Sequence, residues 1–289
     1  TWAQRQQWPL LSPPTAAQIL AGDDTWPPKQ IIEAAPWVFP CLERTYFRHP
    51  EGLTLVRRFL ANAYAGNLGR GIIGCDSWAW AFLRHVWRGR VPVTVALQAF
   101  DETRLARHFR KLVDASGDRP LRFLQSDDGR NVLPPPGNEE SSGESSNFLQ
   151  LLAAHSRGIC GIAKAIWRAN LKTEPDEKLT GEDDSAVCSL ASQTVWVVPW
   201  LQIAHPRLPS GAGRDEAFVL HTLLLHNGLP LELMQRLLPL SPSQIMGTLI
   251  RLEESGLAAQ DESLWQVTPQ GYPAVRQFLQ AGDYLVDQL

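Results

Sequence analysis

Several charged side chains in this sequence follow apolar segments, at positions where they could take part in chemistry. Glu43 closes the apolar run 37–42, and the pair Asp76-Ser77 follows the next short apolar run. Arg48 precedes a predicted helix, in a loop from which an arginine could reach a phosphate on a neighbouring molecule. The alternative interpretation is structural. Glu43 then begins an ordinary loop, Asp76-Ser77 caps the following helix, and Arg48 is solvated or caps local carbonyls.

The common signatures of hydrolases and metal sites do not occur in the sequence. It has no Gly-x-Ser-x-Gly, no His-Glu-x-x-His and no Cys-His signature. The four cysteines form no Cys-x-x-Cys pair, and no cysteine or histidine pair has the spacing of zinc ligands. We therefore expect small buried thiols, a reducing compartment and no metal site.

The segments around the charged residues alternate between strand patterns and helix patterns. Apolar strand candidates lie at 37–42, 71–75 and 91–97, and helix candidates lie at 53–63, 78–86 and 101–113. This alternation predicts an α/β fold with a partial parallel sheet. Other candidates are a helix at 16–21, a helical pair at 148–155 and 159–171, and a strand at 195–201.

The segment from Asp215 onward has a pattern of its own. Two apolar helices lead to a third, which Ser241-Pro242 opens as an N-cap followed by proline at the first helical position. Gly256 ends that helix, a hairpin turns at Asp261-Glu262, and a last helix closes the segment. Three helices, a two-stranded wing and a closing helix predict a winged helix.

The order of these elements resembles the Walker-B-to-sensor-1 stretch of AAA+ and STAND-type P-loop ATPases, and the likeness runs from the first strand to the C-terminus. By position, the resemblance implies that Glu43 is the Walker-B-like catalytic acid. Asp76 or Ser77 would be the sensor 1 residue at the γ-phosphate, and Arg157 would be the sensor 2 residue of a helical lid. Arg48 would be a possible arginine finger.

This resemblance implies ATP and Mg²⁺ as possible cofactors, but the chain departs from the family in its phosphate-binding loop. No segment fits Gly-x-x-x-x-Gly-Lys-Ser/Thr, and Leu42 stands where a second acid usually precedes the Walker B glutamate. Either a P-loop lies on a segment that precedes Thr1, or the nucleotide site is degenerate. We expect ATPase activity only if such a segment supplies the P-loop.

The composition changes along the chain predict five parts. These are a Trp/Pro-rich segment at 1–30, an α/β core portion at 31–125, a disordered insertion at 126–147, a helical lid with an acidic loop at 148–214, and the winged helix at 215–289.

The net charge of −3 averages two regions of opposite sign. Residues 84–122 hold nine basic and four acidic side chains, whereas residues 215–289 hold nine acids and three arginines. Because phosphate neutralisation dominates DNA affinity, an acidic winged helix favours a protein partner over DNA. No apolar run is long enough to span a bilayer, so we expect no membrane insertion and a cytoplasmic location.

The sequence thus predicts a regulatory or scaffolding NTPase-like protein with an incomplete nucleotide site and a winged helix used for protein contact. Two alternatives stay open. One is a non-catalytic protein-interaction module that binds no nucleotide. The other, less favoured, is a DNA-binding regulator that uses the winged helix and the basic region 84–122. Each is compatible with a homo-oligomer.

Overall fold

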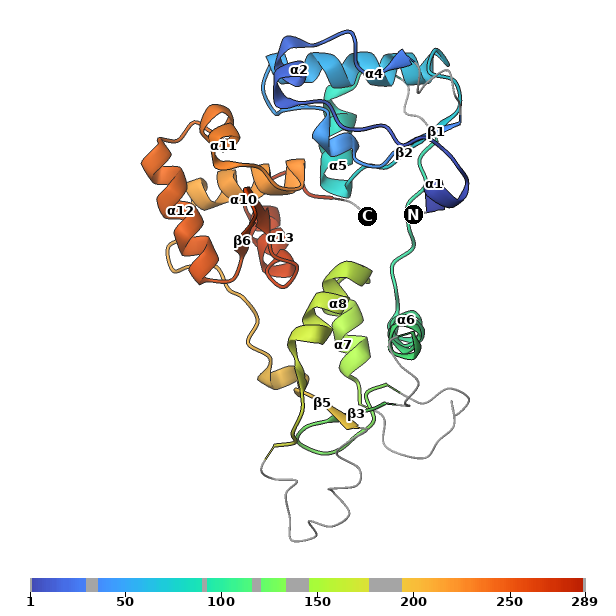
Figure 1. Ribbon diagram of the computed structural model, residues 1–289. Coiled ribbons are helices and arrows are strands. Elements are labelled where there is room, and N and C mark those ends of the chain that lie inside the picture. The colour runs from blue at the N-terminus through green and yellow to red at the C-terminus, as the bar shows by residue number, and fades with distance from the viewer. Residues whose placement is uncertain are drawn as a thin grey trace. The chain divides into compact units, whose positions relative to one another are not determined.

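The computed structural model describes residues 2–29, 36–89, 93–115, 121–133, 146–176 and 194–287. The chain forms two compact units: unit 1 contains residues 1–96 and 207–289, and unit 2 contains residues 97–206. Each unit combines helices with small sheets, which confirms the predicted α/β class (Figure 1). Within the described ranges, no helix has the length and apolar character needed to cross a bilayer.

The first half of unit 1 is built around a strand, a helix and a second strand. Its elements are α1 (Trp2–Arg5), α2 (Ala16–Ala21), β1 (Trp37–Phe39), the 3₁₀ turns η1 (Leu42–Arg44) and η2 (Glu51–Leu53), α4 (Thr54–Tyr64), β2 (Gly71–Ile73) and α5 (Ser77–Val86). The predicted helix 16–21 is confirmed. Thr15 caps it in a capping box with Gln18, and Gly22 ends it in a left-handed conformation.

Strands β1 and β2 pair in parallel, with Val38 opposite Ile72 and α4 as the crossover helix. Over residues 93–97 the predicted strand is not formed, since residues 93–100 have no regular secondary structure; the rest of the prediction, residues 91 and 92, lies outside the described ranges. An alternating apolar pattern makes a segment able to pair, but it becomes a strand only where a neighbouring strand offers hydrogen bonds.

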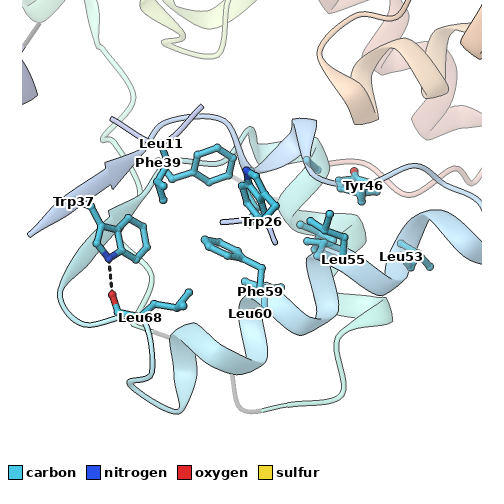
Figure 2. Packing of buried hydrophobic residues seen from close by; sticks show 14 residues of the cluster. Leu11, Trp26, Trp37, Phe39, Tyr46, Leu53, Leu55, Phe59, Leu60 and Leu68 are labelled. Carbon is cyan, nitrogen blue, oxygen red and sulfur yellow. Dashed lines mark hydrogen bonds between the residues drawn. The ribbon is translucent and has the colours of Figure 1, made fainter. Parts of the chain in front are cut away.

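Aromatic rings from α4, β1 and the segment before β1 form the core of this half (Figure 2). The ring centroid of Phe59 lies 5.0 Å from that of Trp26, 5.7 Å from Phe39 and 6.2 Å from Trp37. The Trp37 indole N–H donates to the Leu68 carbonyl at 2.5 Å. This packing fixes the end of β1, from which the segment that carries Glu43 and Arg48 departs.

The second half of unit 1 has the order of elements predicted from Asp215 onward. It consists of α10 (Arg214–His226), α11 (Leu231–Leu237), α12 (Pro242–Glu254), the antiparallel strands β6 (Ala258–Asp261) and β7 (Leu264–Val267), and α13 (Tyr272–Ala281). The predicted Ser241 cap is confirmed, because its hydroxyl accepts from the Gln244 N–H in a capping box. Ten of the thirteen residues of α10 are buried, which makes it the central helix of this half.

Unit 2 packs helices against a small mixed sheet. Its elements are α6 (Glu102–Asp114), β3 (Arg122–Gln125), α7 (Phe148–His155), α8 (Cys160–Ala169), β4 (Leu171–Lys172), β5 (Thr194–Val197) and η4 (Trp200–Gln202). Strand β5 is central, parallel to β3 and antiparallel to β4. Trp167 of α8 contacts Phe109, Phe123 and Phe148, with ring centroids 5.1–5.7 Å apart. Helix α6, expected beside β1 and β2, therefore packs with α7 and α8.

Part of the segment 126–147, predicted as a disordered insertion, is folded into unit 2. Ser126 is fully buried and its hydroxyl donates to the Asp176 carboxylate at 2.9 Å. Asn131 forms an antiparallel bridge with Leu124, so the chain turns back on β3. Residues 134–145 of the insertion, and 177–193 around the predicted acidic loop, lie outside the described ranges.

Candidate functional site

Glu43 lies in η1, directly beyond the carboxyl end of β1, and its side chain is buried. One of its carboxylate oxygens accepts from the Asp76 backbone N–H at 3.2 Å. Because β1 and β2 are parallel, their carboxyl ends lie at one edge, which brings these two predicted site residues together.

Asp76 and Ser77 have structural partners at this edge. The Asp76 carboxylate caps α5 by accepting from the Trp78 N–H at 2.9 Å, as the capping interpretation predicted. Ser77 donates to the carboxylate of Asp287 at 3.1 Å. Burial raises the pKa of Asp76 to about 6, and the nearby charges of Glu43 and Asp287 act in the same direction.

Arg48 reaches across to α10 and binds a buried histidine. Its guanidinium lies 3.0 Å from Nδ1 of His221, and Nε2 of the same ring lies 3.0 Å from the Leu285 carbonyl. Because a guanidinium can only donate, Nδ1 must accept, and Nε2–H then donates to the carbonyl. His221 is therefore neutral. Burial lowers its pKa to about 4, with a further contribution from the positive charge of Arg48.

The carboxylate of Asp287 accepts hydrogen bonds from three side chains of two helices, although Asp287 is only 2% exposed. It accepts from Ser77 at the start of α5, from the Tyr272 hydroxyl at 3.1 Å and from Nε of Arg276 at 2.9 Å. The Trp78 indole N–H in turn donates to the Tyr272 hydroxyl at 3.0 Å. The C-terminal tail is thereby tied to both α5 and α13.

Tyr46 and His226 complete the contact between the two halves of unit 1. The Tyr46 hydroxyl donates to the Leu225 carbonyl at 2.8 Å, and its ring centroid lies 5.0 Å from that of His226. Burial lowers the pKa of His226 to about 3, against an opposing effect of the Glu43 carbonyl, which lies nearby without forming a hydrogen bond. We call this set of contacts the polar junction; its residues are Glu43, Tyr46, Arg48, Asp76, Ser77, Trp78, His221, Leu225, His226, Tyr272, Arg276, Leu285 and Asp287.

Arg157, the predicted sensor 2 residue, is not part of the polar junction. It belongs to unit 2, in the turn between α7 and α8, with a positive φ of 55° followed by Gly158 at 68°. Gly158 is required there because a Cβ would lie 2.5 Å from the Phe100 backbone nitrogen. Within unit 1 the structure thus brings together Glu43, Arg48, Asp76 and Ser77, whereas Arg157 lies in unit 2.

Sequence reasoning missed the histidines, the tyrosines and the aspartate that complete the polar junction. His221 and His226 belong to no motif of the sequence, and Asp287 is only one of the nine acids of residues 215–289. Their bonds between the two halves of unit 1 span 173 to 210 residues of the chain, so no local spacing connects these partners. The signal that the sequence does offer is the pair of histidines within an otherwise apolar helix.

The polar junction is a network of hydrogen bonds and one ion pair within unit 1. Four side chains predicted from the sequence form hydrogen bonds with other groups of unit 1; they are Glu43, Arg48, Asp76 and Ser77. The described part of the chain also contains no group of three or more His, Cys, Asp or Glu residues placed to hold a metal ion. The polar junction holds the first half of unit 1 against α10, α13 and the C-terminal tail.

The polar junction makes stability depend on pH with a definite sign. Near pH 5 the unfolded chain protonates both His221 and His226, whose ordinary pKa is 6.5, whereas the folded chain protonates neither. Asp76 opposes them, because it keeps a proton up to about pH 6 when folded but releases it near 3.8 when unfolded. The unfolded state therefore binds one proton more, and stability falls as pH drops from 6.5 towards 4 by about 1.4 kcal/mol per pH unit.

Replacing His221 with glutamine is expected to flatten this dependence, because one of the two titrating histidines is gone. Urea unfolding of the full chain at several pH values between 4 and 7 measures the slope. His85→Gln, an exposed position on α5, is the matched control and should keep the wild-type slope. A His221→Gln variant with an unchanged slope would contradict the assignment of the neutral, buried ring.

Comparison with known proteins gives one finding. Residues 214–273, from α10 into α13, match the HemN C-terminal domain, which belongs to a radical SAM, coproporphyrinogen oxidase-like family. The expected kinship with AAA+ and STAND ATPases, and the ATP-binding character taken from it, are therefore wrong: an order of strands, helices and a C-terminal helical module is shared by unrelated proteins. No curated protein and no solved structure matches the chain.

Proposed function

We propose that this chain is a non-catalytic protein-interaction module, in which residues 214–287 form a winged helix that offers an acidic surface to a protein partner. The observation that carries the proposal is that one side of this segment contacts the first half of unit 1, while its remaining surface is acidic. We call the first side the fastened side. The fastened side meets the first half of unit 1 through the polar junction, for example through His221 and Asp287. The remaining surface is therefore the part available to a partner.

A bridge to the hairpin supports the winged-helix assignment. Leu229, between α10 and α11, exchanges both backbone hydrogen bonds with Trp265 of β7, at 3.0 and 2.9 Å. The hairpin thereby gains a third partner segment and is anchored beside the helices. Buried residues of α12, such as Ile245 and Leu249, supply the apolar face that packs on α10.

Two arginines of the segment are paired with acids, so few positive charges are left to offset its remaining acids. Arg251 pairs with Glu216, and Arg276 pairs with Asp287. Seven further acids and two further arginines, Arg214 and Arg236, remain between residues 214 and 287; the acids are Asp215, Glu232, Glu253, Glu254, Asp261, Glu262 and Asp283. This surface repels nucleic-acid phosphates and favours a basic protein surface.

The end of α12 provides the sharpest test, because Glu253 and Glu254 are exposed there and Ile250 is 45% exposed nearby on the same helix. A photo-crosslinking residue at position 250 of the full chain should capture the partner, whose affinity is then measured directly. Glu253→Lys combined with Glu254→Lys should weaken that affinity about tenfold or more at low salt. Glu51→Lys, an exposed acid in the first half of unit 1, is the matched control.

Nucleotide and DNA titrations set the limits of this proposal. The intact chain should give no heat with Mg·ATP and should not bind duplex DNA at low salt, where electrostatic binding is strongest. A saturable heat with Mg·ATP would overturn the non-catalytic assignment. DNA binding that weakens steeply with added salt would instead favour the DNA-binding alternative.

A further inference from the structure

Strand β2 pairs with β1 along one of its edges, and its other edge is free within the described ranges. The Arg70 carbonyl accepts from the first residue of β1 at 3.1 Å, and the Gly74 N–H donates to the last residue of β1 at 2.7 Å. Because alternate residues of a strand direct their backbone groups to opposite edges, the N–H and C=O groups of Gly71 and Ile73 point away from β1. No described residue pairs with these four groups.

The outer face of the same sheet has a row of aliphatic side chains that ends at this free edge. Leu10 forms a parallel bridge with Val38, which in turn lies opposite Ile72 of β2. Paired residues of neighbouring strands share a face, so the three side chains lie side by side. Ile72 is 47% exposed. An unpaired edge is a template for a further strand, and natural proteins usually protect it with charges or proline, neither of which occurs in β2.

We propose that the free edge of β2 pairs with the same edge of a second copy, as an antiparallel interface whose two-fold axis passes Ile72. In this register Gly71 of one copy opposes Ile73 of the other, and each such pair exchanges two backbone hydrogen bonds. All four free groups of each copy are thereby satisfied. The two Ile72 side chains meet at the axis. The proposal goes beyond the protein-contact function above, because it rests on β2, outside residues 214–287.

A second copy fits this edge because the edge is complementary to itself. Its free backbone groups are placed symmetrically about Ile72, as a two-fold interface requires. The direction follows from Arg70, which is exposed and directly precedes β2. Antiparallel pairing places Arg70 opposite Gly74 of the other copy, whereas parallel pairing in register would place the two arginines side by side, which is unfavourable.

Sedimentation velocity of the full chain over a range of concentrations tests the proposal. The wild type should show a reversible monomer–dimer equilibrium. Ile72→Lys places two like charges at the axis and should raise the dimer dissociation constant about tenfold or more. Leu10→Lys is the matched control, because Leu10 is 40% exposed on the same face but lies two strands away from the free edge, and it should leave the dimer intact.

Ile72→Cys tests the register directly. The two residues at the axis form a non-hydrogen-bonded pair, whose Cα atoms are about 4.5 Å apart, within the range that a disulfide can bridge. Mild oxidation should therefore join two copies through position 72, as peptide mass spectrometry can show. Leu10→Cys should link far less, and the oxidised wild type accounts for its own free thiols, such as Cys41 and Cys75.

Three outcomes would overturn the proposal. They are a wild type that is monomeric at every concentration, an Ile72→Lys variant that dimerises as well as Leu10→Lys, and an oxidised Ile72→Cys variant with no link between the two positions 72. Circular dichroism checks that every variant is folded, so that a lost dimer is not mistaken for a lost fold.

Discussion

Replacing Phe59 with alanine is expected to lower the free energy of unfolding of unit 1 by about 3–5 kcal/mol. Phe59 is 1% exposed and its ring meets those of Trp26, Trp37 and Phe39. Truncation loses the transfer free energy of the ring and leaves a cavity among rigid neighbours, which cannot collapse to fill it. Urea unfolding followed by far-ultraviolet circular dichroism measures the change, read from the transition of unit 1.

Tyr64→Ala is the matched control, because Tyr64 is the last residue of the same helix and is 47% exposed. Its removal should change the free energy of unfolding by no more than about 0.5 kcal/mol. A similar loss in both variants would mean that helix propensity, and not the aromatic core, explains the effect. A small loss for Phe59→Ala would show that β1 is not held by this cluster.

The features that the sequence predicted well depend on short-range patterns. The caps at Thr15, Asp76 and Ser241 follow from one polar residue placed before a helix, because the bond that each makes spans two or three residues. The helices of both units could be found in the same way, from apolar positions that recur along one face. These elements could therefore be predicted without knowing which distant segments they contact.

The predictions that failed depended on contacts between distant segments. The strand predicted at 91–97 has the right composition, but residues 93–97 have no regular secondary structure. The ATPase-like resemblance rested on the order of elements, and order does not fix which residues meet. Arg157 and Glu43 belong to different units, whereas Ser77 and Asp287 meet across 210 residues of sequence. The candidate site could thus be located in part, at Glu43 and Asp76, but its role could not.

Replacing Asp287 with alanine is expected to destabilise unit 1 by about 3–5 kcal/mol, because the change breaks a buried ion pair and leaves its partners without an acceptor. Arg276 keeps its charge in a mostly buried position, with its side chain 18% exposed. The hydroxyls of Ser77 and Tyr272 also lose their acceptor. Asp283→Asn, at an exposed acid of the same tail, removes the same charge, keeps a residue type that tolerates its positive φ of 56°, and should have a small effect by comparison.

A double-mutant cycle separates the two possible sources of this effect, a link between distant segments and a local ion pair. If the tail fastens α5, Ser77→Ala and Asp287→Ala should be less destabilising together than the sum of the single changes, with a coupling of about 0.5–3 kcal/mol. Additive effects would mean that Asp287 acts only through Tyr272 and Arg276, fifteen and eleven residues away in the chain. Since Ser77 and Asp287 join the two halves of unit 1, a measured coupling would establish that the acidic segment is held in a fixed orientation by its C-terminal tail.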